Sequence, residues 1–125
     1  MNKILVEVSV GELLDKISIL EIKKDKIKDP EKLKFINDEH AILKDQFKKN
    51  VRSDDKLTDL FKSLKEINAK LWVIEDDKRS CEKNSNFSEN FIKLSRDVHF
   101  LNDARAKIKL EMNNHTGSKI KEIKE

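Results

Sequence analysis

Residues that break helices are scarce in this sequence, and their scarcity restricts the chain to a few long elements. Its 125 residues include only 2 glycines and 1 proline, whereas average usage would give about 9 and 6. Charged residues make up 41% of the chain, yet the net charge is only +3, and large apolar residues recur at intervals of three and four. This combination predicts amphipathic helices rather than a disordered chain.

Four helices can be placed between residues that start and stop helices. Ser9 and Glu12 have the spacing of a capping box, Asp29 precedes Pro30, and Gly117 is a helix stop. The pattern predicts helices over residues 10–28, 31–50, 54–83 and 88–114.

The expected fold class is all-α, a four-helix antiparallel bundle built from long helical hairpins. A chain of this length can bury about two-thirds of its surface in one core. We therefore expect a single helical domain over residues 1–116 and a flexible charged tail over residues 117–125.

Composition excludes several classes of function. The single cysteine, Cys81, has no partner for a disulfide or a zinc site, so we expect no cofactor and a reducing cytoplasm. No apolar stretch approaches the ~18 residues that span a bilayer. The 24 acidic residues are interleaved with the 27 basic ones, so no helix carries a basic stripe. We expect neither a membrane nor a nucleic-acid partner.

Several polar residues fall on helix faces that otherwise carry apolar side chains. At 100° per residue, the inward positions include Glu21, Asn68, Glu75, Arg79, Asn102, Arg105 and Lys109. An unpaired charge buried in a bundle is costly, and an antiparallel hairpin closing near Asn86 brings the third and fourth helices together. We expect a buried polar cluster of Glu21, Glu75, Arg79, Asn102 and Arg105, flanked by Asp15, Lys16 and Asp103.

The first helix is apolar on two roughly opposite sides, one with Val10, Leu14 and Ile17 and the other with Ile19 and Ile22. Such a helix needs a partner on each side. Because the third helix is also longer than the first two, we expect another subunit to cover part of the surface, most simply in a two-fold homodimer.

Two functions follow directly from a cluster of this composition. A satisfied internal network would make the protein an interaction or assembly module with a protein partner, and this is our main prediction. The alternative is a helical pocket for a small anion, with or without enzymatic activity. In that pocket Arg79 and Arg105 donate to the anion, Glu75 orients them, and Asn68 and Asn102 act as polar selectors.

A third function is suggested by Glu12 and Asp15, which have the Glu-x-x-Asp spacing of a metal-binding acidic pair. Magnesium-dependent nucleotide pyrophosphohydrolases of the all-helical type use such pairs on facing helices. Glu75 and Asp76 are the nearest equivalent of a second pair.

Several blocks of the sequence resemble a known family. They are Val8 to Lys16, Ile19 to Lys23, Leu71-Trp72, Ile74 to Asp76, Arg79, Cys81-Glu82, Asn102-Asp103, Arg105-Ala106 and Lys109. In these blocks the chain resembles a family of small bacterial proteins of unknown function, over nearly its whole length. The resemblance implies a stand-alone helical domain and brings no activity, cofactor or catalytic residue with it.

Overall fold

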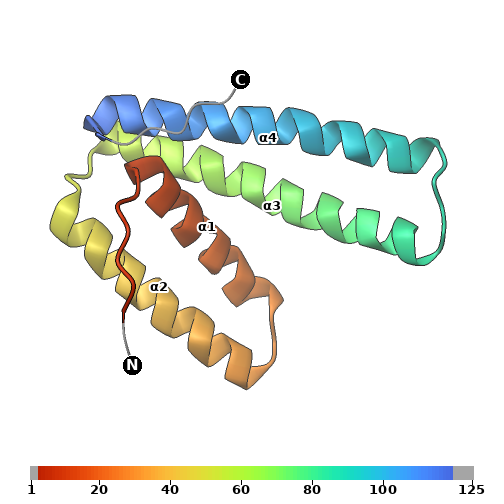
Figure 1. Cartoon of the computed structure of the whole chain (residues 1–125), viewed down its shortest axis with the longest axis horizontal. Coiled ribbons are helices and arrows are strands. Elements are labelled where there is room, and N and C mark those ends of the chain that lie inside the picture. The colour runs from red at the N-terminus through yellow and green to blue at the C-terminus, as the bar shows by residue number, and fades with distance from the viewer. Residues whose placement is uncertain (1–2, 120–125) are drawn as a thin grey trace.

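Four α-helices make up the computed structural model, which describes residues 3–119 (Figure 1). They are α1 (Val10–Lys26), α2 (Pro30–Asn50), α3 (Asp55–Lys83) and α4 (Glu89–Thr116). The described residues contain no strand, which confirms the all-α prediction, and every predicted helix end lies within two residues of the observed one. Residues 120–125 of the predicted tail lie outside the described residues. Within residues 3–119, no helix is both long and apolar enough to cross a membrane.

Side-chain caps fix the starts of α1, α2 and α3. In each case an oxygen accepts from a backbone N–H of the first turn, Ser9 from Glu12, Asp29 from Glu31 and Asp54 from Leu57. These bonds satisfy groups that have no partner inside the helix. At the other end of the chain Gly117 stops α4 in the left-handed region, with a φ of 71°, which glycine adopts without steric cost.

The helices form two antiparallel hairpins of unequal length. Figure 1 shows α3 and α4 running side by side, with the shorter α1–α2 hairpin packed near one of their ends. α1 packs against α2, α3 and α4, whereas α2 packs on the outside, against α1. The bundle therefore exists at one end only. We call the part of α3 and α4 that extends beyond α1 and α2, residues 69–83 and 89–101, the distal hairpin.

The apolar core lies where α1 crosses the α3–α4 hairpin. Its buried side chains are Leu14, Ile17, Leu57, Leu64 and Met112. Burial of each such side chain stabilises the fold by about 1.5–3 kcal/mol. By contrast, the buried apolar side chains of the distal hairpin are Leu71 and Cys81, so the distal hairpin contributes much less to stability.

Both apolar sides of α1 are covered within the chain. On one side Asp15 bonds to α3 and α4, and on another Glu21 bonds to α2 and α3. Ile22 is buried as well. The two-sided pattern of α1 therefore needs no second subunit, and only the length of α3 remains from the sequence argument for a dimer.

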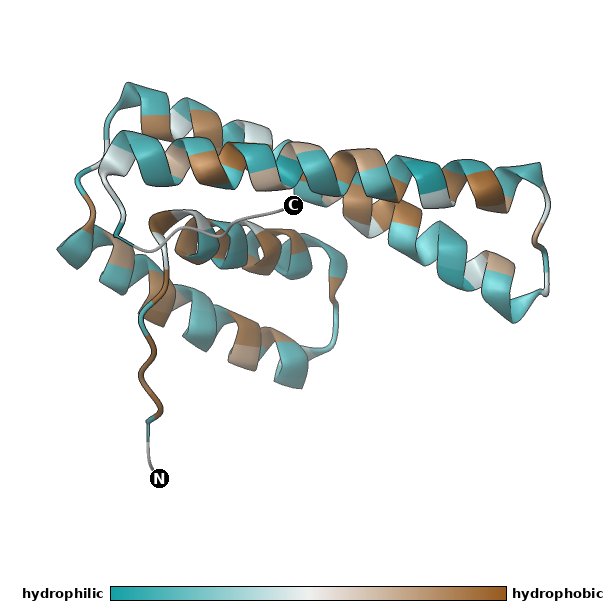
Figure 2. Ribbon diagram, turned by 45° about the horizontal axis from the view of Figure 1, so that its top comes forward, coloured by the Kyte–Doolittle hydropathy of each residue, from teal (hydrophilic) through white to brown (hydrophobic). Residues whose placement is uncertain are grey.

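An extended segment, residues 3–9, precedes α1. Ile4, Leu5 and Val6 are exposed, and Figure 2 shows this hydrophobic run standing clear of the helices. Ser9, which caps α1, is buried. The segment therefore joins the packed structure only at its last residue.

Candidate functional site

A buried carboxylate marks the crossing of α1 and the α3–α4 hairpin. Asp15 is 2% exposed, although the sequence suggested only a flanking position for it. Six residues, which we call the Asp15 cluster, are linked there: Glu12, Asp15, Ser18, Asn68, Arg105 and Lys109. They come from α1, α3 and α4.

Arg105 is the main partner of Asp15. Its Nε donates to Oδ1 at 2.9 Å, and its Nη2 donates to Oδ2. Asn68 Nδ2 donates to the same Oδ1 at 2.9 Å, and Lys109 Nζ lies 3.7 Å from Oδ2. Bidentate pairs of arginine and carboxylate are about twice as strong as neutral hydrogen bonds. One carboxylate thus ties three helices together.

Ser18 completes the α1 side of the cluster. Its Oγ donates to the backbone carbonyl of Asp15 at 2.7 Å and accepts from Asn68 Nδ2, also at 2.7 Å. Because the hydroxyl hydrogen is used within α1, the oxygen is left to accept from α3. The amide of Asn68 is therefore oriented by two acceptors of α1.

Lys109 brings Glu12 into the cluster. The ammonium is buried, and its Nζ donates to Glu12 Oε2 at 2.9 Å. This contact corrects the predicted capping box. Ser9 caps the Glu12 N–H as expected, but the Glu12 carboxylate turns to α4 because a buried ammonium needs an anionic partner.

The N-terminus of α1 is closed by the end of α4. The Gly11 N–H donates to Asn113 Oδ1 at 2.7 Å, and the Val10 N–H donates to Ser118 Oγ at 3.3 Å. A Cβ at Gly11 would lie 2.6 Å from the backbone oxygen of Lys109, so only glycine fits this helix crossing. The predicted flexible tail is docked at Ser118, its second residue.

The pKa of Asp15 is lowered by its partners. Burial would raise it, because desolvation disfavours the charged form. Hydrogen bonds from Arg105 and Asn68 and the charges of Arg105 and Lys109 outweigh burial and hold the pKa below its ordinary value of 3.8. Asp15 is therefore ionised in the folded protein at neutral and mildly acidic pH.

We expect Asp15 to make stability depend on pH in acid. A carboxylate with a lowered folded-state pKa stabilises the fold above its unfolded-state pKa, about 3.9, and this contribution is lost as the pH falls through the folded-state value. The thermal unfolding midpoint should fall below about pH 4 more steeply for the wild type than for Asp15→Asn. Parallel profiles of the two proteins in circular dichroism would contradict this assignment.

A second polar group links α1 to α2 and α3, and we call Glu21, Lys24, His40 and Lys65 the Glu21 cluster. Glu21 accepts from Lys65 Nζ and pairs with His40 Nε2, both at 3.1 Å, and Lys24 Nζ lies 3.0 Å from His40 Nδ1. Because an ammonium can only donate, Nδ1 accepts and Nε2 carries the proton. Burial opposes ionisation of Glu21, but hydrogen bonds from His40 and Lys65 lower its pKa.

The prediction that Glu21, Arg79 and Arg105 converge in one buried cluster is wrong. Glu21 belongs to its own cluster, and Arg79 lies on the distal hairpin with 75% of its side chain exposed, where Nη1 pairs with Asp76 at 2.9 Å. The reason is that, among the described residues, Asn68 is the position farthest along α3 that bonds to α1. On the rest of α3, a side chain that points inward faces only α4.

The remaining predicted site residues lie outside both clusters. Glu75 and Asn102 are half-buried, and Lys16 and Asp103 are exposed. His99 Nε2 lies 3.6 Å from a carboxylate oxygen of Asp103. Of the ten predicted positions, Asp15, Asn68, Arg105 and Lys109 are the four that the structure brings together.

Other members of the network were not predicted as members of the polar cluster, although Glu12 was predicted as a capping residue and as a candidate metal ligand. Ser18 and Glu12 each lie three positions from Asp15, and Asn113 lies four positions after Lys109. These spacings place each pair on one helix face, and they were the available signal. His40, Lys65 and Ser118 carried no comparable signal, because their partners are distant in the chain.

The charged groups of the Asp15 cluster pair with one another. Glu12 and Asp15, the suggested magnesium-binding pair, each accept from a cation of α4. Among residues 3–119, no three histidine, cysteine or acidic side chains gather as a metal site would require. No buried side-chain nitrogen or oxygen of the described part of the chain lacks a hydrogen-bond partner. This geometry joins helices firmly.

One family model matches the chain, that of a family of unknown function (DUF6165), over residues 4–125. Comparisons with curated proteins and with solved structures give no match. The matched range holds all four helices and both polar clusters, which confirms the predicted resemblance to a family of unknown function. The chain therefore belongs to the family of unknown function DUF6165.

Proposed function

We propose that this protein is a helical interaction module of the bacterial cytoplasm. In this proposal the Asp15 cluster holds α1, α3 and α4 together as a rigid base, and the distal hairpin presents the binding surface. The carrying observation is that Val73, Ile92 and Phe100 are 49, 56 and 57% exposed on the distal hairpin, whereas the polar cluster is internally bonded. Cys81, a buried free thiol, suits a reducing compartment.

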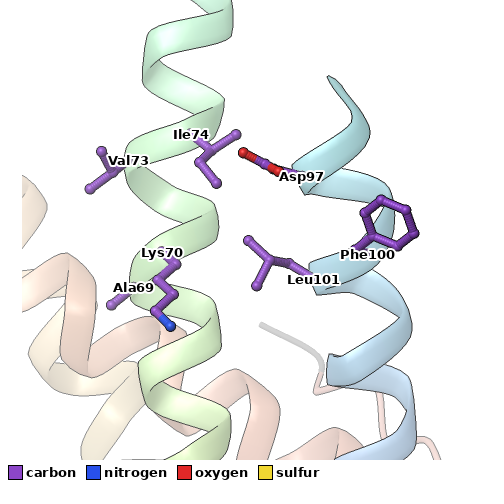
Figure 3. Close-up of a pocket in the computed structure, with 7 residues that line it drawn as sticks. All are labelled: Ala69, Lys70, Val73, Ile74, Asp97, Phe100 and Leu101. Carbon is purple, nitrogen blue, oxygen red and sulfur yellow. The ribbon is translucent and has the colours of Figure 1, made fainter. Parts of the chain in front are cut away.

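The binding surface includes a groove between α3 and α4. It has a volume of about 630 Å³ and is lined by Ala69, Lys70, Val73, Ile74, Asp97, Phe100 and Leu101 (Figure 3). Its walls are mostly apolar side chains. Large apolar groups gathered on the surface of a small protein are typical of protein-binding sites, which supports an interaction role.

The small-anion pocket is less well supported, because its two arginines lie apart. Arg105 and Asn68 both bond to Asp15, so Asn68 marks the position of Arg105 along α3. Arg79 lies eleven residues after Asn68 in the same helix. That separation is about 16 Å along the axis. Arg105 also directs two donors at Asp15, so one anion cannot use both guanidinium groups together.

Thermal unfolding in the presence of small anions tests this choice. We expect no shift with inorganic phosphate, with nucleotides with or without magnesium, or with dicarboxylates. A specific ligand at 100 times its Kd would add about 2.7 kcal/mol to the free energy of unfolding. A shift of that size with any of these probes would overturn the interaction module in favour of a pocket.

A pair of variants tests whether the exposed apolar surface serves the fold. Phe100→Gln should change the free energy of unfolding by less than about 0.5 kcal/mol, because the ring is more than half exposed. Leu71→Ala, at a buried position of the same hairpin, should cost about 2–5 kcal/mol. Urea unfolding at a protein concentration where the chain is monomeric measures both, and a comparable loss for Phe100→Gln under those conditions would mean that the ring is part of the core.

A further inference from the structure

The groove of the distal hairpin has opposite charges at its two ends. Figure 3 shows Lys70 at one end and Asp97 beside Ile74 at the other, with apolar side chains of both helices between them. Within residues 3–119 neither charge forms an ion pair, and Lys70 is exposed. The groove therefore combines an apolar floor with one cationic and one anionic end.

The chain also has more surface than a compact protein of its size. It exposes 9242 Å², which is about a third more than the roughly 6,900 Å² expected for a compact protein of 14.7 kDa. The distal hairpin and the extended segment 3–9 are the described parts that stand away from the core. A dimer interface of ordinary size hides about 800 Å² on each copy, which this excess accommodates.

A second copy of the chain matches both the charged ends of the groove and its apolar lining. In a two-fold interface, residue i of one copy contacts residue j of the other, and j contacts i. A two-fold axis that crosses the groove near its centre exchanges its ends, so the cationic end of each copy meets the anionic end of the other. Apolar side chains near Val73 and Phe100 then meet their counterparts.

We propose that this groove binds the same groove of a second copy, in a two-fold dimer in which Lys70 of each copy faces Asp97 of the other. The proposal rests on the interaction module proposed above and names its partner. It accounts for an apolar groove on a hairpin that no other helix covers. It also gives each of the two charged ends an opposite charge.

Charge reversal in mixed dimers tests the pairing. Analytical ultracentrifugation should give twice the monomer mass of 14.7 kDa for the wild type. Lys70→Glu and Asp97→Lys should each raise the dimer dissociation constant at least tenfold, because each creates two pairs of like charges. An equimolar mixture of the two variants should recover the wild-type constant, since the mixed dimer has two opposite pairs.

Matched controls separate local pairing from net charge. Arg79→Glu and Asp59→Lys make the same charge changes at exposed positions outside the groove, and their dissociation constants should stay within twofold of the wild type. Circular dichroism establishes that all variants are helical. A mixture that stays monomeric, or equal effects of the controls, overturns the proposed contact.

The dimer and the interaction module can fail separately. A wild type that remains at 14.7 kDa up to about 100 μM, where a dimer with a Kd of about 1 μM would be mostly assembled, overturns the dimer. If the anion panel then gives no shift and Phe100 is dispensable for folding, the module survives with a different protein as partner. A shift with phosphate or a nucleotide overturns the module itself.

Discussion

Replacing Arg105 with leucine is expected to lower the free energy of unfolding by about 3–5 kcal/mol. The substitution removes the bidentate donor of Asp15 and leaves a carboxylate that is 2% exposed with Asn68 and the more distant ammonium of Lys109. Removing one partner of a buried pair is costly because the other charge stays desolvated. Urea unfolding at pH 7, followed by circular dichroism, measures the loss.

The matched control is Arg79→Leu, the same change at an arginine with 75% of its side chain exposed. Its pair with Asp76 lies on the helix surface, where such pairs contribute at most about 1 kcal/mol. The double variant Asp15→Leu with Arg105→Leu should recover part of the loss, because it removes both charges together. Equal losses for Arg105→Leu and Arg79→Leu would show that the Asp15 cluster does not hold the helices together.

Gly11→Ala is expected to destabilise the protein by about 1–3 kcal/mol. Inside a helix this change normally stabilises, by about 1 kcal/mol, so the expected sign is the reverse of the helix propensity. The new Cβ would lie 2.6 Å from the Lys109 backbone oxygen and 3.0 Å from its Cα. Because these are backbone atoms, α1 and α4 must move apart, which weakens the bonds of Asn113 and of the Asp15 cluster.

Thermal and urea unfolding of Gly11→Ala measure this clash, and Gly117→Ala serves as the comparison. At Gly117 no atom lies within 4 Å of an added Cβ, but the φ of 71° is unfavourable for alanine, at a cost of about 1–2 kcal/mol. The folded state of that variant should keep its helix contacts, so its loss of stability reflects only the backbone conformation of residue 117. A Gly11→Ala protein as stable as the wild type would show that the two helices do not approach as closely as described.

The helices could be predicted well from the sequence, because their starts are encoded locally. Ser9, Asp29 and Asp54 cap the helices that they were expected to start or precede, and each cap depends on residues two or three positions away. How far α1 covers the α3–α4 hairpin is different. It involves the close approach of α1 to α4 at Gly11 and Lys109, two residues that no local rule connects.

The candidate site was predicted in part for the same reason. Placing residues around a helix correctly identified Asn68 and Arg105 as inward positions, but it gives the direction of a side chain and not what lies there. For Arg105 that direction leads to Asp15 of α1, and for Arg79 it leads past the end of the bundle to solvent. Glu21 was assigned to the wrong partners because α2, which supplies His40, was not placed beside it.

The bonds that close the start of α1 also constrain the order in which the chain can fold on the ribosome. Asp15 and Arg105 are 90 residues apart, and Gly11 and Asn113 are 102 apart. Until α4 has been synthesised, α1 has no cap from Asn113, its buried carboxylate has no guanidinium partner, and Met112 is missing from the core. The α1–α2 hairpin therefore cannot complete its native contacts before α4 has been synthesised, because the bonds that it lacks join residues about 100 positions apart in the chain.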